Sequence, residues 1–129
     1  MRWSAVFRLA TLASFGAAAI VACSDSAPPA AAPTDAEAGW AVARQAGCAA
    51  CHGADSRGGV GPGWVGLYGS EVELADGSTV IADQSYLFES IRDPSAQQAA
   101  GLPAIMPTNS LSDDEIDAIV TYIESLADG

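Results

Sequence analysis

The sequence predicts a small, mainly α-helical domain with one short β-hairpin near residues 71–81, placed behind an export segment. Three observations lead to this fold class. The chain has 129 residues, which allows one small domain and no second catalytic one. Half of its residues are hydrophobic, so disorder throughout is excluded. Apolar residues follow a helical spacing at both ends of the domain and alternate only briefly between them.

The chain is strongly acidic, with 16 Asp and Glu against five cations, all of them Arg, and a formal charge of −11. Such a chain is repelled by phosphate backbones, so we expect no nucleic-acid partner. It holds one His and three Cys. A Cys/His zinc site would need nearly all of them, and a Ser-His-Asp triad would have only His52 to use.

The first 22 residues predict a signal peptide. Arg2 and Arg8 precede an apolar run from Leu9 to Ala22, which at 14 residues is shorter than the roughly 20 that span a bilayer. The run ends in Ile20-Val21-Ala22-Cys23, which resembles the lipobox of bacterial lipoproteins. In that family the chain is cut before the Cys, which then carries lipid. The alternative is an ordinary export signal that ends near a structural Cys.

Residues 23–34 predict a lipidated Cys23 followed by a disordered tether rich in Ala and Pro. The segment has no aromatic residue and no aliphatic side chain larger than Ala, so it cannot bury enough surface to order itself. Residues 35–129 remain for the folded domain. Without its signal the chain keeps three Arg and all 16 acids, a charge of −13.

The first element of the domain is a helix that Asp35 caps and that ends near Gly47, with Trp40, Val42 and Ala43 as apolar positions. A glycine-rich stretch from Gly53 to Gly69 follows, which is too irregular for a helix or strand.

A short two-stranded hairpin comes next. Residues 71–74 alternate in polarity and predict the first strand. Asp76-Gly77 is the residue pair typical of a type I′ turn, and residues 79–81 are predicted to form the second strand.

Two more helices complete the predicted elements. Asp83 caps a helix that carries Tyr86, Leu87, Ser90 and Ile91 and ends at Asp93-Pro94. The last helix starts with a capping box of Ser112 and Glu115 and a hydrophobic staple of Leu111 and Ile116. Its apolar stripe is predicted to be core and consists of Ile116, Ile119, Val120, Ile123 and Leu126. These few elements cannot close a good core, so we expect an apolar group to fill the middle.

Cys48-Ala49-Ala50-Cys51-His52 matches the C-x-x-C-H motif of covalent haem attachment. Two thiols three positions apart reach the two vinyl groups on one porphyrin edge, and the following His points its imidazole at the iron. A thioredoxin-like dithiol would need a preceding strand and a sheet, and a zinc site would need a fourth ligand beyond Cys48, Cys51 and His52. We therefore expect one covalently attached haem c as the cofactor.

We expect Met106 to be the sixth ligand of the haem iron. No second His exists, and Met1 leaves with the signal, so Met106 is the only thioether of the processed chain. It stands between Pro103 and Pro107, outside any periodic segment, which makes a core-filling role the weaker interpretation. His/Met ligation raises the reduction potential and leaves no open position for a substrate. We expect electron transfer and no catalytic residues.

Over nearly all of residues 35–129 the chain resembles a class I c-type cytochrome. The resemblance rests on C-x-x-C-H, on Gly61-Pro62, on Met106-Pro107 and on a terminal helix with Tyr122. It implies the small class I cytochrome c fold, in which the N- and C-terminal helices pack around covalently attached haem. In that family the proline at the position of Pro62 offers its carbonyl to the ring N–H of the proximal His.

A more specific resemblance is to the cytochrome domain at the C-terminus of subunit II of bacterial haem-copper oxidases. It rests on segments 66–70, 72–78, 86–87 and 90–94, with the hairpin around Asp76-Gly77 as the distinguishing mark. A lipid anchor and tether stand where subunit II has its copper-binding domain, so we expect a free-standing relative.

The chain also departs from the family's pattern. The usual aromatic residue about five positions before the first haem Cys is Ala43 here, and Trp40 is expected to pack in its place. Ser70 stands where mitochondrial cytochromes carry an Arg that neutralises a haem propionate. Trp64 and Tyr68 are the candidate hydrogen-bond donors to the cofactor.

Together these inferences predict a lipid-anchored electron carrier on the periplasmic side of the bacterial cell envelope. Its partners would be redox proteins: a quinol-oxidising or other donor complex, and an oxidase or other acceptor. No small-molecule substrate is expected. One alternative is a permanent haem c subunit of an oxidase or dehydrogenase complex, and another is a peroxidase or gas sensor with an open iron position.

Overall fold

The computed structural model describes residues 33–129 of the chain. The predicted signal peptide, the predicted lipidation at Cys23 and nearly all of the predicted tether lie outside these residues and stay predictions. Among the described residues, no helix is both long enough and apolar enough to cross a lipid bilayer.

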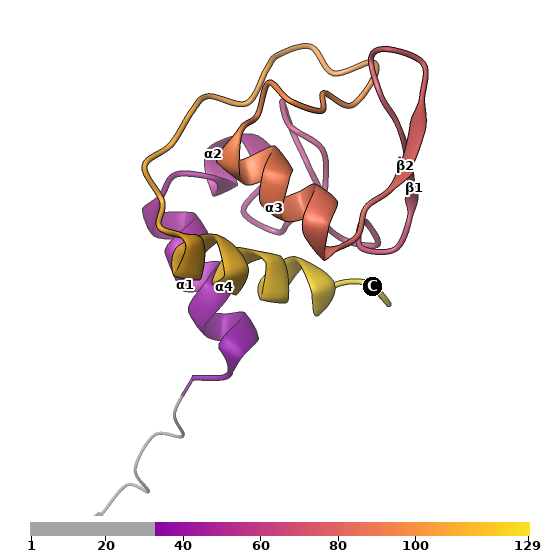
Figure 1. Ribbon diagram of the computed structural model, residues 1–129. Helices are drawn as coiled ribbons and strands as arrows, with labels where there is room; N and C mark the ends of the chain where they lie inside the picture. Colours follow the sequence, from indigo (N-terminus) through magenta and orange to yellow (C-terminus); the bar gives the residue numbers. More distant parts are fainter. Residues whose placement is uncertain (1–32) are drawn as a thin grey trace, which may run out of the picture. The chain divides into compact units, whose positions relative to one another are not determined.

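The described residues form four helices and one hairpin, in the order α1 (Asp35–Gln45), α2 (Ala49–His52), β1 (Glu71–Glu73), β2 (Thr79–Ile81), α3 (Gln84–Arg92) and α4 (Asp113–Glu124). Helix α4 packs against both α1 and α3 (Figure 1). The predicted fold class is therefore confirmed: the first and last helices pack against each other, and a short hairpin is the only sheet of the described chain.

Both long terminal helices begin with a capping box. In α4 the backbone N–H of Glu115 donates to the Ser112 hydroxyl, and the Glu115 carboxylate accepts from the backbone N–H of Ser112, as predicted. In α1 the same arrangement joins Thr34 and Glu37. The prediction that Asp35 caps α1 was wrong by one residue, because Thr34 with Glu37 satisfies two N–H groups while Asp35 stays in the first helical turn.

Helix α3 begins and ends where the sequence indicated. The Asp83 side chain accepts a hydrogen bond of 2.9 Å from the backbone N–H of Tyr86, and the helix stops at Arg92, before Asp93 and Pro94. Beyond its end, the Asn109 side-chain amide donates to the Ile91 carbonyl at 2.7 Å. This bond fastens the segment after α3 back onto the helix.

The hairpin pairs Glu71 with Ile81 and Glu73 with Thr79, but its turn differs from the prediction. The backbone N–H of Gly77 donates to the Leu74 carbonyl, and Gly77 has φ 84°. A type I′ turn would also need a positive φ at Asp76, and Asp76 has none. The connection is thus a longer one, in which the Asp76 carboxylate accepts from the backbone N–H of Ser78 and holds the turn.

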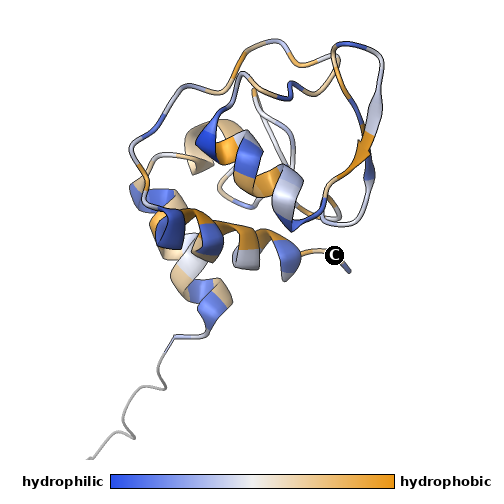
Figure 2. Ribbon diagram, viewed as in Figure 1, coloured by the Kyte–Doolittle hydropathy of each residue, from blue (hydrophilic) through white to orange (hydrophobic). Residues whose placement is uncertain are grey.

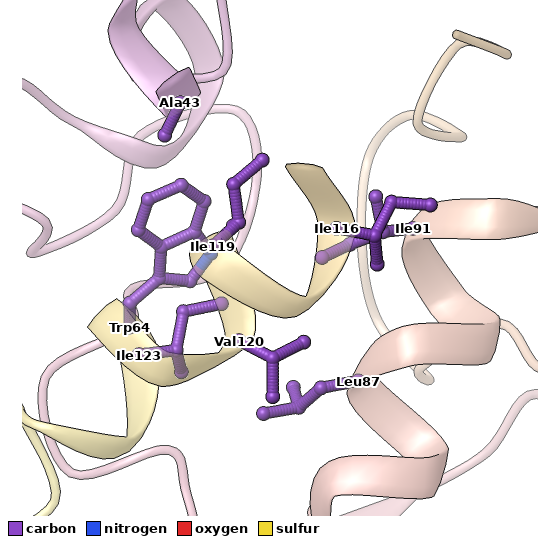
Figure 3. Close-up of a cluster of buried hydrophobic side chains, with 8 residues drawn as sticks. All are labelled: Ala43, Trp64, Leu87, Ile91, Ile116, Ile119, Val120 and Ile123. Carbon is purple, nitrogen blue, oxygen red and sulfur yellow. The ribbon is translucent and has the colours of Figure 1, made fainter. Parts of the chain in front are cut away.

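The core lies between α4 and the elements on either side of it. Figure 2 shows apolar and polar residues on different sides of the α4 ribbon, and the buried residues of this helix are all apolar. Figure 3 shows the α4 isoleucines and Val120 between Leu87 and Ile91 of α3 and the Trp64 indole. Four residues of the predicted stripe are buried, and Leu126 is partly buried at the edge of the core.

Candidate functional site

The C-x-x-C-H residues form a single helical turn, α2, which the sequence alone did not predict. The backbone N–H groups of Cys51 and His52 both donate to the Cys48 carbonyl, at 3.1 and 3.0 Å. Residues three and four positions apart are neighbours on a helix surface, so this turn brings Cys51 and His52 each next to Cys48. Both thiols are half-buried, and the His52 side chain is buried.

The His52 imidazole is oriented by a hydrogen bond. Its Nδ1 donates to the Pro62 carbonyl at 2.8 Å, in the same pairing that the resemblance implied. A neutral imidazole with its proton on Nδ1 has a free lone pair on Nε2, which is the form that binds a metal ion. Burial lowers the pKa of His52, while the bond to Pro62 raises it. Burial also raises the pKa of the Cys48 thiol.

Two neighbours confine the ring of His52. The Trp64 indole stacks on it, with ring centroids 4.7 Å apart and planes 26° from parallel. Gly61 lies against it, since a Cβ at this position would be 3.0 Å from the His52 Cε1 and 3.1 Å from Nδ1. Any side chain at residue 61 would push the imidazole out of place.

A cavity of about 250 Å³ opens beside this ring. It is far larger than the 10–15 Å³ that one water needs. His52 and Met106, which are 54 positions apart in the sequence, both contribute to its walls, together with Cys48, residues of α3 and isoleucines of α4. Most of its lining is apolar, as the expectation of an apolar group in the middle of the domain requires.

The other candidate residues differ in whether they line this cavity. Pro62 and Trp64 line the cavity, and Trp64 is only 5% exposed. Cys51 is half-buried on the α2 turn and does not contribute to the cavity wall. Tyr68 packs at the edge of the core and does not line the cavity either. The predicted hydrogen bonds from Trp64 and Tyr68 to the cofactor stay predictions.

Trp40 of α1 packs against the core, and its equivalence to the family's aromatic residue stays a prediction. It stacks on Tyr122 of α4, with centroids 5.1 Å apart, and meets Trp64 edge-on at 6.4 Å. The Ser70 hydroxyl donates to the Leu67 carbonyl at 2.7 Å, so it is used within its own loop.

The lining of the cavity fits a large, flat, mostly apolar ring with a metal at its centre. An apolar wall suits the porphyrin faces, and His52 and Met106 offer one nitrogen and one sulfur to the same space. The hydroxyl of Ser90, which also lines the cavity, is the one buried side-chain polar atom of the described chain without a hydrogen-bond partner. A buried polar atom that lines a cavity and has no hydrogen-bond partner indicates that a further molecule binds in the cavity.

The competing site types find no support in the described residues. A thioredoxin-like dithiol needs a parallel sheet, whereas the sheet of residues 33–129 has two antiparallel strands. A zinc site needs clustered ligands, and no three His, Cys, Asp or Glu side chains of this range gather in a way that could hold a metal.

Sequence reasoning missed several supporting residues. Ser56 is buried, and its hydroxyl is 2.8 Å from that of Tyr122. Gly39 and Asn109 were also not singled out. None of the three stands in a motif, and each has a contact partner 18 or more positions away along the chain.

Comparison with known protein families identifies the domain. A search of curated proteins finds no match. The family model described as Cytochrome c matches residues 36–127, which span α1 to the end of α4 and include the whole cavity. The chain therefore belongs to the cytochrome c family, whose domain binds haem c covalently, transfers electrons between redox proteins and is typically not an enzyme.

Proposed function

We propose that the protein is a monohaem electron carrier, anchored by lipid at Cys23 on the periplasmic side of a bacterial membrane. In this proposal Cys48 and Cys51 would hold the haem through thioether bonds, and His52 and Met106 would bind its iron. The observation that carries it is the shared cavity, to which the oriented imidazole of His52 and the thioether of Met106 both contribute.

Haem c supplies an iron that takes up and gives off one electron. The chain's own residues decide what this iron can do. Pro62 holds the proton of His52 on Nδ1 and so keeps Nε2 free for the metal. Met106, if bound to the iron, would leave no position for dioxygen, peroxide or substrate. The apolar walls keep water from the site and favour the less charged, reduced state.

The ligand assignment is tested with carbon monoxide, which binds reduced haem only at an open position. The wild-type protein should bind it slowly or not at all, and its oxidised form should show the sulfur-to-iron charge-transfer band. Met106→Ala should open the iron to carbon monoxide, lose that band and lower the reduction potential. Thr108→Ala, an exposed change in the same loop that does not line the cavity, is the matched control and should keep all three wild-type properties.

Rapid carbon monoxide binding by the wild-type protein would instead favour a gas sensor or peroxidase. A Met106→Ala variant that retains the charge-transfer band would refute the assignment of Met106.

The rim of the cavity indicates how partners are recognised. Leu102 and Ile105 line the cavity and also reach solvent, 40% and 63% exposed. With no Lys in the chain and a charge of −13 after processing, a ring of cations cannot steer the encounter. We infer contact through this small apolar rim, with the membrane tether supplying the local concentration.

Stopped-flow reduction of one acidic and one basic acceptor across ionic strength tests this contact. Transfer to the basic acceptor should slow as salt rises, because the Debye length shortens. Faster transfer to the acidic acceptor at low salt than at high salt would contradict the proposal.

The resemblance to the subunit II cytochrome domain supports a terminal oxidase as one acceptor. A carrier and a permanent subunit differ in how they purify. In mild detergent a free carrier separates from its partners, whereas a subunit stays with them in fixed stoichiometry.

A further inference from the structure

The loop that follows the haem-binding motif is fastened to α4 by one pair of hydroxyl groups. Ser56 Oγ lies 2.8 Å from Tyr122 OH, across 66 positions of sequence. Ser56 is 1% exposed and has φ 61°, the only positive φ of a non-glycine residue among those described. This left-handed conformation is strained for a residue with a Cβ, so glycine would be the easier choice. A serine here is explained by its hydroxyl.

Ser56 also joins the two ends of the loop. Its carbonyl accepts hydrogen bonds from the backbone N–H groups of Trp64 and Val65, at 2.7 and 3.2 Å. Between Ser56 and Trp64 the chain carries Gly61, which lies against the imidazole, and Pro62, whose carbonyl accepts from His52. A shift of Ser56 therefore moves the groups that orient His52.

Tyr122 is itself held in place by aromatic packing. Its ring stacks on Trp40 of α1 at 5.1 Å and meets Trp64 edge-on at 6.1 Å. The phenol is thus fixed by the contact between the first and last helices. Contacts therefore connect the crossing of α1 and α4 with the His52 ring, through the hydroxyl groups of Tyr122 and Ser56.

We propose that Ser56 and Tyr122 are a positioning pair that sets the strength of the hydrogen bond from His52 Nδ1 to Pro62. The inference rests on the proposed role of His52 as iron ligand. A stronger bond at Nδ1 makes Nε2 a better donor to the metal, which favours oxidised iron. Loosening the pair weakens the bond and raises the reduction potential.

Two single variants remove the bond from opposite sides. Ser56→Ala keeps the Cβ and its backbone strain, and Tyr122→Phe keeps the ring that stacks on Trp40. The readout is solvent exchange of the His52 Nδ1 proton, followed by nitrogen-resolved NMR in the reduced holoprotein. A hydrogen bond contributes a net of about 0.5–1.5 kcal/mol, so either variant should speed this exchange by about two- to tenfold. Both should also raise the reduction potential, and the double variant should add little further.

The control is Thr121→Ala. Thr121 lies next to Tyr122 on α4, is exposed, and donates only to the Asp117 carbonyl of its own helix. It should leave the Nδ1 exchange rate and the reduction potential at wild-type values. The backbone amides of α3 serve as an internal reference and should exchange at unchanged rates in all variants.

Three results would overturn either the proposed function or the positioning role of the pair. If the wild-type His52 ring protons lack the ring-current shift of an iron ligand, the proposed function itself fails. If they show that shift but neither variant changes the Nδ1 exchange or the potential, the positioning role alone is overturned. Equal acceleration of the Nδ1 proton and of the α3 amides would also overturn it, because it would show only a loss of global stability.

Discussion

Gly39 of α1 and Ala118 of α4 are in backbone contact. A Cβ built on Gly39 would lie 2.0 Å from the Ala118 carbonyl oxygen and 3.0 Å from Tyr122 Cβ. The first and last helices cross at this point, where only a hydrogen atom fits between them. The same crossing fixes the ring of Tyr122 and, through Trp40 and Trp64, the surroundings of His52.

Gly39→Ala should destabilise the holoprotein. Alanine in a helix gains up to about 1 kcal/mol over glycine. Forcing a methyl group into backbone costs about 1–3 kcal/mol or more, and at 2.0 Å the high end applies, so the clash wins. Guanidinium unfolding should show a net loss of about 2 kcal/mol. Ala41→Gly, an exposed change in the same helix, is the control and should lose only about 1 kcal/mol. If Gly39→Ala lost no more unfolding free energy than Ala41→Gly, α1 would be able to move away from α4 at little cost.

Asn109→Ala should weaken the hold on the Met106 loop. Asn109 donates to the Ile91 carbonyl at 2.7 Å, and its side-chain oxygen accepts from the backbone N–H of Leu111 at 3.1 Å. Loss of both bonds should cost about 1–3 kcal/mol. The sulfur-to-iron charge-transfer band should then disappear at a lower temperature than in the wild type. The neighbouring exposed change Ser110→Ala should leave that temperature unchanged, and the same value for both variants would refute the role of Asn109.

The two capping boxes should make stability depend on acid pH. Hydrogen bonds from Thr34 and Ser112 lower the pKa of Glu37 and of Glu115 below 4.5. A carboxylate whose pKa is lower in the folded state stabilises the fold above its unfolded pKa. That stabilisation is lost as the pH falls through the folded value. The Glu37→Gln, Glu115→Gln double variant can still form both capping boxes. Its unfolding midpoint should therefore fall less steeply than that of the wild type as the pH decreases below 4.5. Parallel curves for wild type and variant would contradict this.

Cys23→Ser should abolish the lipid anchor while haem is still attached. Cys23 ends the lipobox-like segment and precedes a predicted tether without large apolar residues. The variant should stay unprocessed or appear in the soluble periplasmic fraction, with an unchanged haem spectrum. Unmodified wild-type protein in the soluble fraction would refute the anchor.

The elements whose signals are local were predicted well. The capping box of Ser112 and Glu115, the cap of Asp83 and the stop before Asp93 depend on residues within a few positions of one another. The cap of α1 was assigned to Asp35 because the sequence offers two neighbouring capping residues. Only the pairing of Thr34 with Glu37 distinguishes them. The turn at Asp76 was misassigned because a residue pair does not fix the length of a loop, which here depends on the bond from Gly77 to Leu74.

The sequence by itself determined the chemistry of this protein. C-x-x-C-H, a single His and one Met outside the predicted signal peptide restrict the possible cofactor and its ligands, because those residue types are so few. The tertiary structure decided what surrounds them: Gly39 against Ala118, Ser56 against Tyr122, and the cavity that His52 and Met106 share. These contacts join segments far apart in the chain. Distance, burial and backbone angle at such contacts depend on how the helices cross, and no local spacing of residues encodes that crossing.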